Sequence, residues 1–143
     1  MTEPESVGYQ YVVLRCVPDI VREEFLNVGV VLYSQMGGFL DVAWRLDPAR
    51  LQAFSPSIDP SDVQLCFDEA VQVCRGSAAP GRPELRRLGQ RFGWLSAPRS
   101  TVLQPGPIHG GVTDDPAAEL QRLLRVMVGR SAESRSARTS VVE

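Results

Sequence analysis

The chain has 143 residues, of which 43% are hydrophobic and 22% charged, and its 15 basic residues, all arginines, face 17 acidic ones. This length fits one domain with a core large enough to fold without disulfides or metals. The net charge of -2 argues against general nucleic-acid affinity, which needs a basic excess. No apolar run reaches the roughly 20 residues of a membrane helix, and the acidic N-terminus is unlike a signal peptide, so we expect a cytoplasmic protein.

Three strands are predicted in the first third of the chain. Residues 9–17 are rich in β-branched and aromatic side chains and end at a proline, which is typical of a strand. In residues 27–34 apolar side chains occupy both the odd and the even positions, which point to opposite faces of a sheet. This strand is therefore expected to be central and covered on both faces. Residues 39–45 follow after a glycine turn and form a predicted hairpin with them. Residues 19–25 predict a short helical turn capped by Asp19.

Three Asp-Pro pairs predict helix starts, because aspartate caps a helix N-terminus and proline fits its first turn. The helices expected from these starts cover residues 48–54, 60–75 and 116–128. A weaker helix is predicted over residues 84–92 and a short fourth strand over residues 100–104. The glycine- and proline-rich residues 105–112 are expected to form a loop.

Strands followed by helices, with one late strand, predict the α+β class: a small, mostly antiparallel sheet of about four strands with helices packed on it. The domain is expected to span residues 9–128, between a flexible N-terminus (1–8) and a disordered tail (129–143). Three cysteines without Cys-x-x-Cys spacing are interpreted as free, mostly buried thiols.

Arg15 stands out as a charge inside an apolar strand. A buried charge needs a partner, so Arg15 is expected either at the sheet edge in water or paired with Glu23, Glu24 or Asp41. The functional alternative is a guanidinium that binds phosphate or carboxylate.

A second group of polar residues precedes the central strand. Arg22, Glu23 and Asn27 are followed by Gly29, whose bare backbone allows close approach. Since Asn27 and Gly29 are two residues apart, they are expected on one strand face, where they could form a binding notch with the arginines. The alternative is that Gly29 accommodates a crossing helix and Arg22 pairs with a glutamate.

The late loop over residues 108–116 contains the single histidine, His109, together with Thr113 and Asp115. His109 could act as a lone general base or hold the turn through a hydrogen bond. No second cluster of His or Cys suggests a metal site, and no nucleophile motif accompanies it. The catalytic residues therefore stay unknown, and neither a metal nor another cofactor is expected.

Residues 75–99 carry six arginines and one acid, whereas residues 59–69 carry four acids and no base. Arg86, Arg87 and Arg91 beside Trp94 form a candidate basic surface for nucleic acid. The simpler interpretation is a solvated or self-complementary surface. No phosphate-binding glycine loop is present.

Three segments together resemble an uncharacterised bacterial family, the domain-of-unknown-function family numbered 3037. They are Tyr9-x-Tyr-Val-Val-Leu-Arg15, Arg22-x-Glu-x-x-Asn-Val-Gly-Val30 and Ile108-His-Gly-Gly-Val-Thr-Asp-Asp-Pro116. The residues that match the family pattern are Arg15, Arg22, Glu23, Asn27, Gly29, His109, Thr113 and Asp115. The resemblance implies a short stand-alone protein and points to a kinase-like partner, and the family has no established activity that could be transferred to this chain.

We therefore expect an interaction or accessory module that regulates or assists a partner protein of kinase-like type, and the sequence favours this over an enzyme. The alternative is an anion- or nucleotide-binding hydrolytic site formed by Arg15, Arg22, Asn27 and the His109 loop. A further alternative is weak nucleic-acid binding through the surface of residues 75–99, although nucleic acid is not the expected partner. No membrane association is expected, and self-association stays open.

Overall fold

The computed structural model describes residues 5–99, 101–129 and 138–140. Its centre is one antiparallel sheet in the order β4-β1-β2-β3-β6, with β5 also paired to β1. The strands are β1 (Val7–Cys16), β2 (Leu26–Ser34), β3 (Phe39–Trp44), β4 (Leu103–Pro105), β5 (His109–Thr113) and β6 (Arg138–Ser140). The α+β prediction is confirmed.

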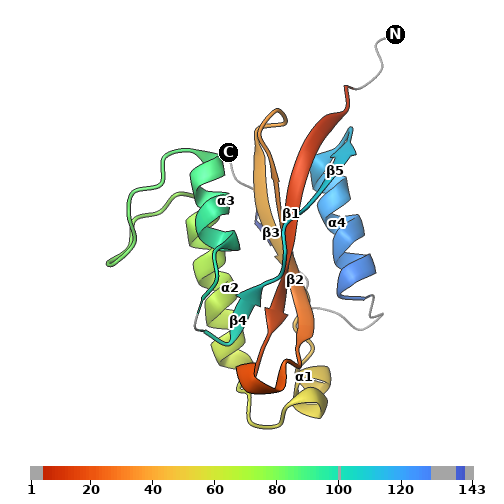
Figure 1. The fold of residues 1–143 in the computed structure, drawn as a ribbon, viewed down its shortest axis with the longest axis vertical. Helices are drawn as coiled ribbons and strands as arrows, with labels where there is room; N and C mark the ends of the chain where they lie inside the picture. Colours follow the sequence, from red (N-terminus) through yellow and green to blue (C-terminus); the bar gives the residue numbers. More distant parts are fainter. Residues whose placement is uncertain (1–4, 100, 130–137, 141–143) are drawn as a thin grey trace.

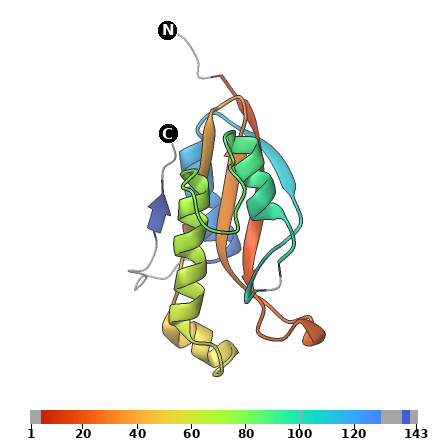
Figure 2. The same ribbon diagram turned by 90° about the vertical axis from the view of Figure 1, so that its left-hand side faces the viewer.

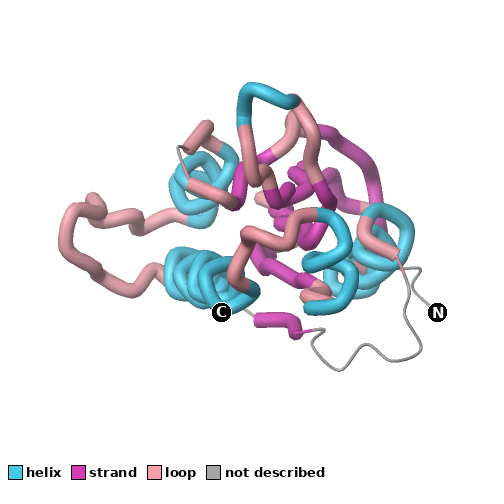
Figure 3. The backbone as a smooth tube through the Cα atoms, turned by 90° about the horizontal axis from the view of Figure 1, so that it is seen from below, coloured by secondary structure: helices cyan, strands magenta, loops and turns pink. Residues whose placement is uncertain are grey.

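Helices cover both faces of the sheet. The helical elements are η1 (Ile20–Arg22), α1 (Pro48–Phe54), α2 (Pro60–Cys74), α3 (Leu88–Ser96) and α4 (Pro116–Met127). Helices α2 and α3 lie on one face and α4 on the other (Figure 1), an arrangement also visible after a quarter turn (Figure 2). Seen from below, the strands lie between helices (Figure 3).

The Asp-Pro helix starts are confirmed. Asp47, Asp59 and Asp115 each accept a hydrogen bond from a backbone N–H in the first turn of α1, α2 and α4, at 3.0, 2.9 and 3.1 Å. These bonds satisfy amides that have no partner within the helix.

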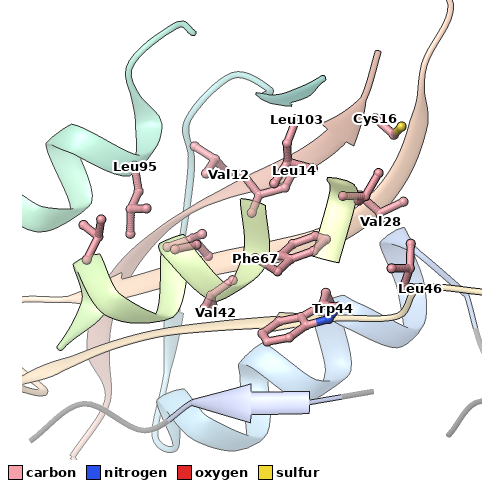
Figure 4. Close-up of a cluster of buried hydrophobic side chains, with 14 of the residues drawn as sticks. Val12, Leu14, Cys16, Val28, Val42, Trp44, Leu46, Phe67, Leu95 and Leu103 are labelled. Atoms are coloured by element: carbon pink, nitrogen blue, oxygen red, sulfur yellow. The ribbon is translucent and has the colours of Figure 1, made fainter. Parts of the chain in front are cut away.

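The two faces of the sheet bury separate apolar clusters, and β2 contributes to both, because Val31 packs towards α2 and Val30 towards α4. In the larger cluster, Trp44 and Phe67 stack with ring centroids 4.8 Å apart (Figure 4). Leu120, Leu123 and Leu124 of α4 fill the smaller cluster. The expectation of a central strand covered on both faces is confirmed.

Three predicted boundaries are wrong. The glycine-rich segment expected to be a loop contains β5, which satisfies backbone groups along the outer edge of β1. Helix α3 begins at Leu88, four residues late, because the Gln90 side chain accepts from the amides of Arg86 and Arg87 and so caps the helix there. Strand β1 begins at Val7, inside the segment expected to be flexible.

Within the segment predicted to be a disordered tail, residues 138–140 form β6 against β3. Residues 130–137 and 141–143 of that tail lie outside the described part of the chain, as do residues 1–4 of the predicted flexible N-terminus.

Candidate functional site

The late motif holds the start of α4. The amide of Asp115 donates to the Thr113 hydroxyl at 3.1 Å, and the Asp115 carboxylate accepts from Ala118 at 3.1 Å. Thr113 therefore fixes the turn out of β5, and Asp115 caps the helix. Both residues have a structural role here.

Tyr9 joins the sheet to the first turn of α4. Its hydroxyl donates to Glu119, which also accepts two hydrogen bonds of 2.7 Å from Arg122. A Cβ on Gly111 would lie 2.5 Å from the Tyr9 ring, so only glycine lets the ring cross β5. Burial and then the bond to Glu119 raise the pKa of Tyr9 to about 12. The hydrogen bond from Arg122 is the main cause that holds the pKa of Glu119 below its ordinary value.

Three side chains hold the other end of α4, where the last backbone carbonyls lack partners within the helix. The bonds run from Asn27 Nδ2 to the Met127 oxygen (3.1 Å), from Arg50 Nη1 to the Val128 oxygen (2.9 Å) and from Arg45 Nη1 to the Gly129 oxygen (2.6 Å). Two positive guanidinium groups also favour the negative end of the helix dipole. The Nδ2 group of Asn27 thus binds α4, whereas its Oδ1 is buried without a hydrogen bond to any described residue.

The prediction that Asn27 and Gly29 share a strand face is wrong. The pairing of β1 with β2 shifts register between Leu14 and Arg15, so that Leu14 faces Gly29 but Arg15 faces Asn27. The extra residue of this β-bulge changes the alternation. A Cβ on Gly29 would lie 2.7 Å from the Phe67 ring of α2. Gly29 therefore makes room for a crossing helix, which was the alternative to a binding notch.

Arg22 and Glu23 lie in the connection between β1 and β2. Arg22 pairs with Glu24 at 2.7 Å, and the side chains are 68% and 58% exposed. Glu23 ends the turn of η1 in the left-handed backbone conformation, with φ 56°. Arg22 lines a surface pocket of about 320 Å³ that contains neither Arg15 nor His109. The notch predicted for these residues is not assembled.

Arg15 has neither of the expected environments. It is partly buried, its guanidinium lies 4.0 Å from the centroid of the Phe25 ring, and the structure gives it no hydrogen bond or ion pair with any described residue. The predicted pairing with Glu23, Glu24 or Asp41 is therefore wrong. Asn27 lies beside Arg15 on the neighbouring strand.

His109 is exposed on β5 and faces Tyr11 of β1, with ring centroids 5.2 Å apart. Tyr11 and Arg15 are four residues apart on one strand, so His109 and Arg15 are separated by about 14 Å along the sheet. The structure does not bring His109 together with Arg15 and Arg22.

The candidate basic surface is reduced by contacts within the chain. Arg91 donates to the backbone oxygens of Leu85, Cys74 and Arg86, at 2.8, 3.3 and 3.2 Å. Arg86 pairs with Glu84 at 3.2 Å, and Arg87 precedes α3 as its N-cap residue. The guanidinium of Arg91 thus holds a loop.

Further chemistry is limited in the part of the chain that the structure covers. No group of three or more His, Cys, Asp or Glu side chains there could hold a metal. None of the helices described has the length and apolar character needed to cross a bilayer. The thiols of Cys16, Cys66 and Cys74 are free, as predicted, and burial is the main cause that raises the pKa of each.

Sequence reasoning missed Phe25, Arg45 and Arg50. The spacing of Phe25 from Arg15 offered no signal, because their contact depends on how the chain turns between β1 and β2. Arg45 and Arg50 reach acceptors 84 and 78 residues away. The motif that contains Tyr9 gives no sign of its hydrogen bond to Glu119, which lies 110 residues later.

No curated protein and no solved structure matches the chain. A family model described as "Protein of unknown function (DUF3037)" matches residues 11–128. That range includes all eight residues of the resemblance together with Glu119, Arg45 and Arg50, and it ends at the C-cap residue of α4, Val128. The chain therefore belongs to the DUF3037 family.

Proposed function

We propose that this protein is an interaction module that binds a partner protein through the connection between β1 and β2. The observation that carries the proposal is an exposed apolar cluster: Ile20, Val21 and Phe25 are 72%, 85% and 43% exposed. Single exposed apolar residues are ordinary, but a group within six residues is typical of a contact surface. We call these three residues, with Arg15 over Phe25, the connection surface.

The surroundings of the connection surface are hollowed and accessible. The connection projects from the lower end of the molecule in Figure 2. An open pocket of about 470 Å³ lies beside it, lined by Ile20, Pro18, Ile58 and Gln104 among others. Pro18 also lines the pocket of about 320 Å³ that contains Arg22. Side chains of a partner could therefore enter on both sides of the apolar cluster.

Contacts within the chain also stabilise the connection. Asp19 accepts from the Val21 amide at 3.0 Å, and the Glu23 amide donates to the Ile20 oxygen at 3.3 Å. Arg15 packs on the ring of Phe25. A surface ordered in advance loses less conformational entropy on binding, which supports a role in recognition.

The test is affinity co-purification of the full chain from its native host at several salt concentrations, with the kinase-like protein that the family resemblance implies as a defined first bait. Wild type is compared with Val21→Ser and with Met36→Ser, a matched control because Met36 is 84% exposed elsewhere on the surface. We expect one partner that is lost with Val21→Ser and kept with Met36→Ser. A chain that purifies alone at every salt concentration, or a partner that both variants retain equally, would contradict the proposal.

A further inference from the structure

We infer that Arg15 is a carboxylate-binding residue, and that the partner protein places an aspartate or glutamate side chain, flanked by apolar residues, on its guanidinium. The inference rests on the proposed function, since the acidic residue would belong to the partner that covers the connection surface.

The first argument is that Arg15 lacks an anion. The ion pairs that the structure shows among described residues involve Arg22, Arg82, Arg86 and Arg122, but not Arg15. Its Nε is sealed from solvent without a hydrogen-bond acceptor, whereas its terminal nitrogens make no bond and keep contact with solvent. A partly buried cation without a counter-charge is stabilised by any carboxylate that reaches it.

The second argument is that packing against Phe25 and Gly106 orients the Arg15 guanidinium and leaves its terminal N–H groups accessible. The Phe25 ring lies 4.0 Å from it, and a Cβ on Gly106 would lie 3.0 Å from its central carbon. The phenyl ring therefore packs on the guanidinium, while the backbone of Gly106 leaves just enough room beside it. Stacking engages the face of the cation and leaves the in-plane N–H donors of the terminal nitrogens available.

The third argument selects a single carboxylate over a polyanion. The connection carries Asp19, Glu23 and Glu24 against one arginine, Arg22. Phosphates or a nucleic-acid backbone would be repelled by these three acids, whereas one carboxylate can approach Arg15 along the apolar cluster. Guanidinium and carboxylate also match geometrically through paired hydrogen bonds. Ile20, Val21 and Phe25 are expected to contact the apolar residues that flank the acid.

The probe is a displayed library of random short peptides, selected on the full-length wild-type protein. We expect the selected peptides to share an aspartate or glutamate next to an apolar residue. Binding should fall at least about tenfold with Arg15→Gln, because a charge-assisted pair is lost. Arg15→Lys should fall less, since it keeps the charge but not the planar fork. Arg125→Gln is the matched control for charge, on the exposed side of α4, and should bind as wild type.

A second measurement does not depend on the folding of any variant. The wild-type protein is titrated with sodium acetate, with sodium chloride at equal ionic strength as the reference, and the side-chain N–H resonances of the arginines are followed by NMR. We expect a larger acetate-specific shift at Arg15 than at Arg125. Inorganic phosphate is titrated in parallel and should shift Arg15 no more than acetate does.

The outcomes separate this inference from the proposed function. Selected peptides that depend on Val21 but not on Arg15, or that contain no acidic residue, would overturn the role of Arg15 and leave the connection surface standing. Peptides that bind independently of both Val21 and Phe25 would overturn the proposed function. An equal acetate shift at Arg15 and Arg125, or a stronger response of Arg15 to phosphate, would also count against a carboxylate site.

Discussion

The family residues around α4 and those near the connection between β1 and β2 have different environments in the structure. Around α4, the polar motif residues have partners: Thr113 and Asp115 hold its start, and Asn27 binds a carbonyl at its end. In the connection between β1 and β2, apolar side chains are exposed, and Arg15 at the end of β1 has no ion pair with a described residue. The family motif therefore has two parts: one docks α4 onto the sheet, and the other carries the proposed binding surface.

This difference shows how to interpret family residues without a known activity. A polar residue whose hydrogen bonds are all made within the fold is explained by stability, and Thr113 and Asp115 are such residues. A partly buried charge without a partner is not explained by stability, because its desolvation is uncompensated. Arg15 is such a residue, because it has neither a hydrogen bond nor an ion pair with the described residues, and we interpret it as a binding residue.

The largest expected effect is a loss of stability when the packing of α4 on the sheet is disrupted. Leu124 is fully buried against the sheet, whereas Val21 is 85% exposed. Leu124→Ala should lower the free energy of unfolding by about 3 kcal/mol, because it removes buried methyl groups and leaves a cavity. Val21→Ala should change it by less than about 0.5 kcal/mol. Urea denaturation of both variants measures the difference, and a loss of similar size in both would mean that the connection belongs to the core.

A smaller effect is expected at the end of α4. Arg45→Met and Arg50→Met together should lower the free energy of unfolding by about 2 kcal/mol, because two charge-assisted bonds to the final carbonyls are lost. Arg125→Met is the matched control, since Arg125 lies in the last turn of the same helix. Equal losses in the double variant and the control would show that only the helix dipole matters, and not the individual bonds. Thermal unfolding at constant pH provides the comparison.

Much of the fold could be predicted from local signals. Each Asp-Pro pair marks a helix start, because the cap and the first turn lie within four residues. Strand β5 could not be predicted in this way, since Gly110 and Gly111 resemble a loop and their pairing depends on β1, about 100 residues earlier. The start of α3 has no N-cap side chain of the usual kind: the Gln90 side chain instead accepts from the amides of Arg86 and Arg87, just before the helix, and no local pattern predicts this.

The candidate site was predicted less well, for a physical reason. The polar residues were identified by type, but their partners lie far away in sequence: Asn27 binds a carbonyl 100 residues later. The bulge beside Arg15 also changes which face Gly29 occupies, and no local pattern predicts it. Arg15 itself can be recognised from the sequence, because a charged residue inside an apolar strand is unusual.

The pair of Tyr9 and Glu119 gives the α4 region a pH dependence. Tyr9→Phe should lower the free energy of unfolding by about 1 kcal/mol near neutral pH. Because folding raises the pKa of Tyr9 to about 12, its contribution is complete below its ordinary pKa near 10 and is lost as the pH rises towards 12. Folding lowers the pKa of Glu119. The contribution of the Glu119 carboxylate to stability is therefore present above its ordinary pKa near 4.3, and it is lost as the pH falls through the lowered value.

The measurement for this pair is the difference between wild type and Tyr9→Phe across the pH range. We expect a plateau between about pH 5 and pH 10 that declines on both sides. Glu119→Gln is the companion variant and should remove the acid decline. A difference that stays constant from acid to alkaline pH would mean that the hydroxyl contributes through packing, and not through its bond to the carboxylate.

The smallest expected effect concerns two ion pairs, one in the connection and one on α4. Arg22 and Glu24 form an ion pair in the connection with both side chains more than half exposed, whereas Glu119, paired with Arg122, is only 12% exposed. Double-mutant cycles should give a coupling below about 0.5 kcal/mol for the first pair and about 1 kcal/mol for the second, because water and salt screen exposed charges. Raising the salt concentration should remove most of the first coupling and less of the second. A coupling energy in the connection as large as that at α4 would mean that the ion pair stabilises the connection. The connection would then resemble the α4 region, whose polar residues are engaged in stabilising the fold, and would not be a surface free to bind a partner.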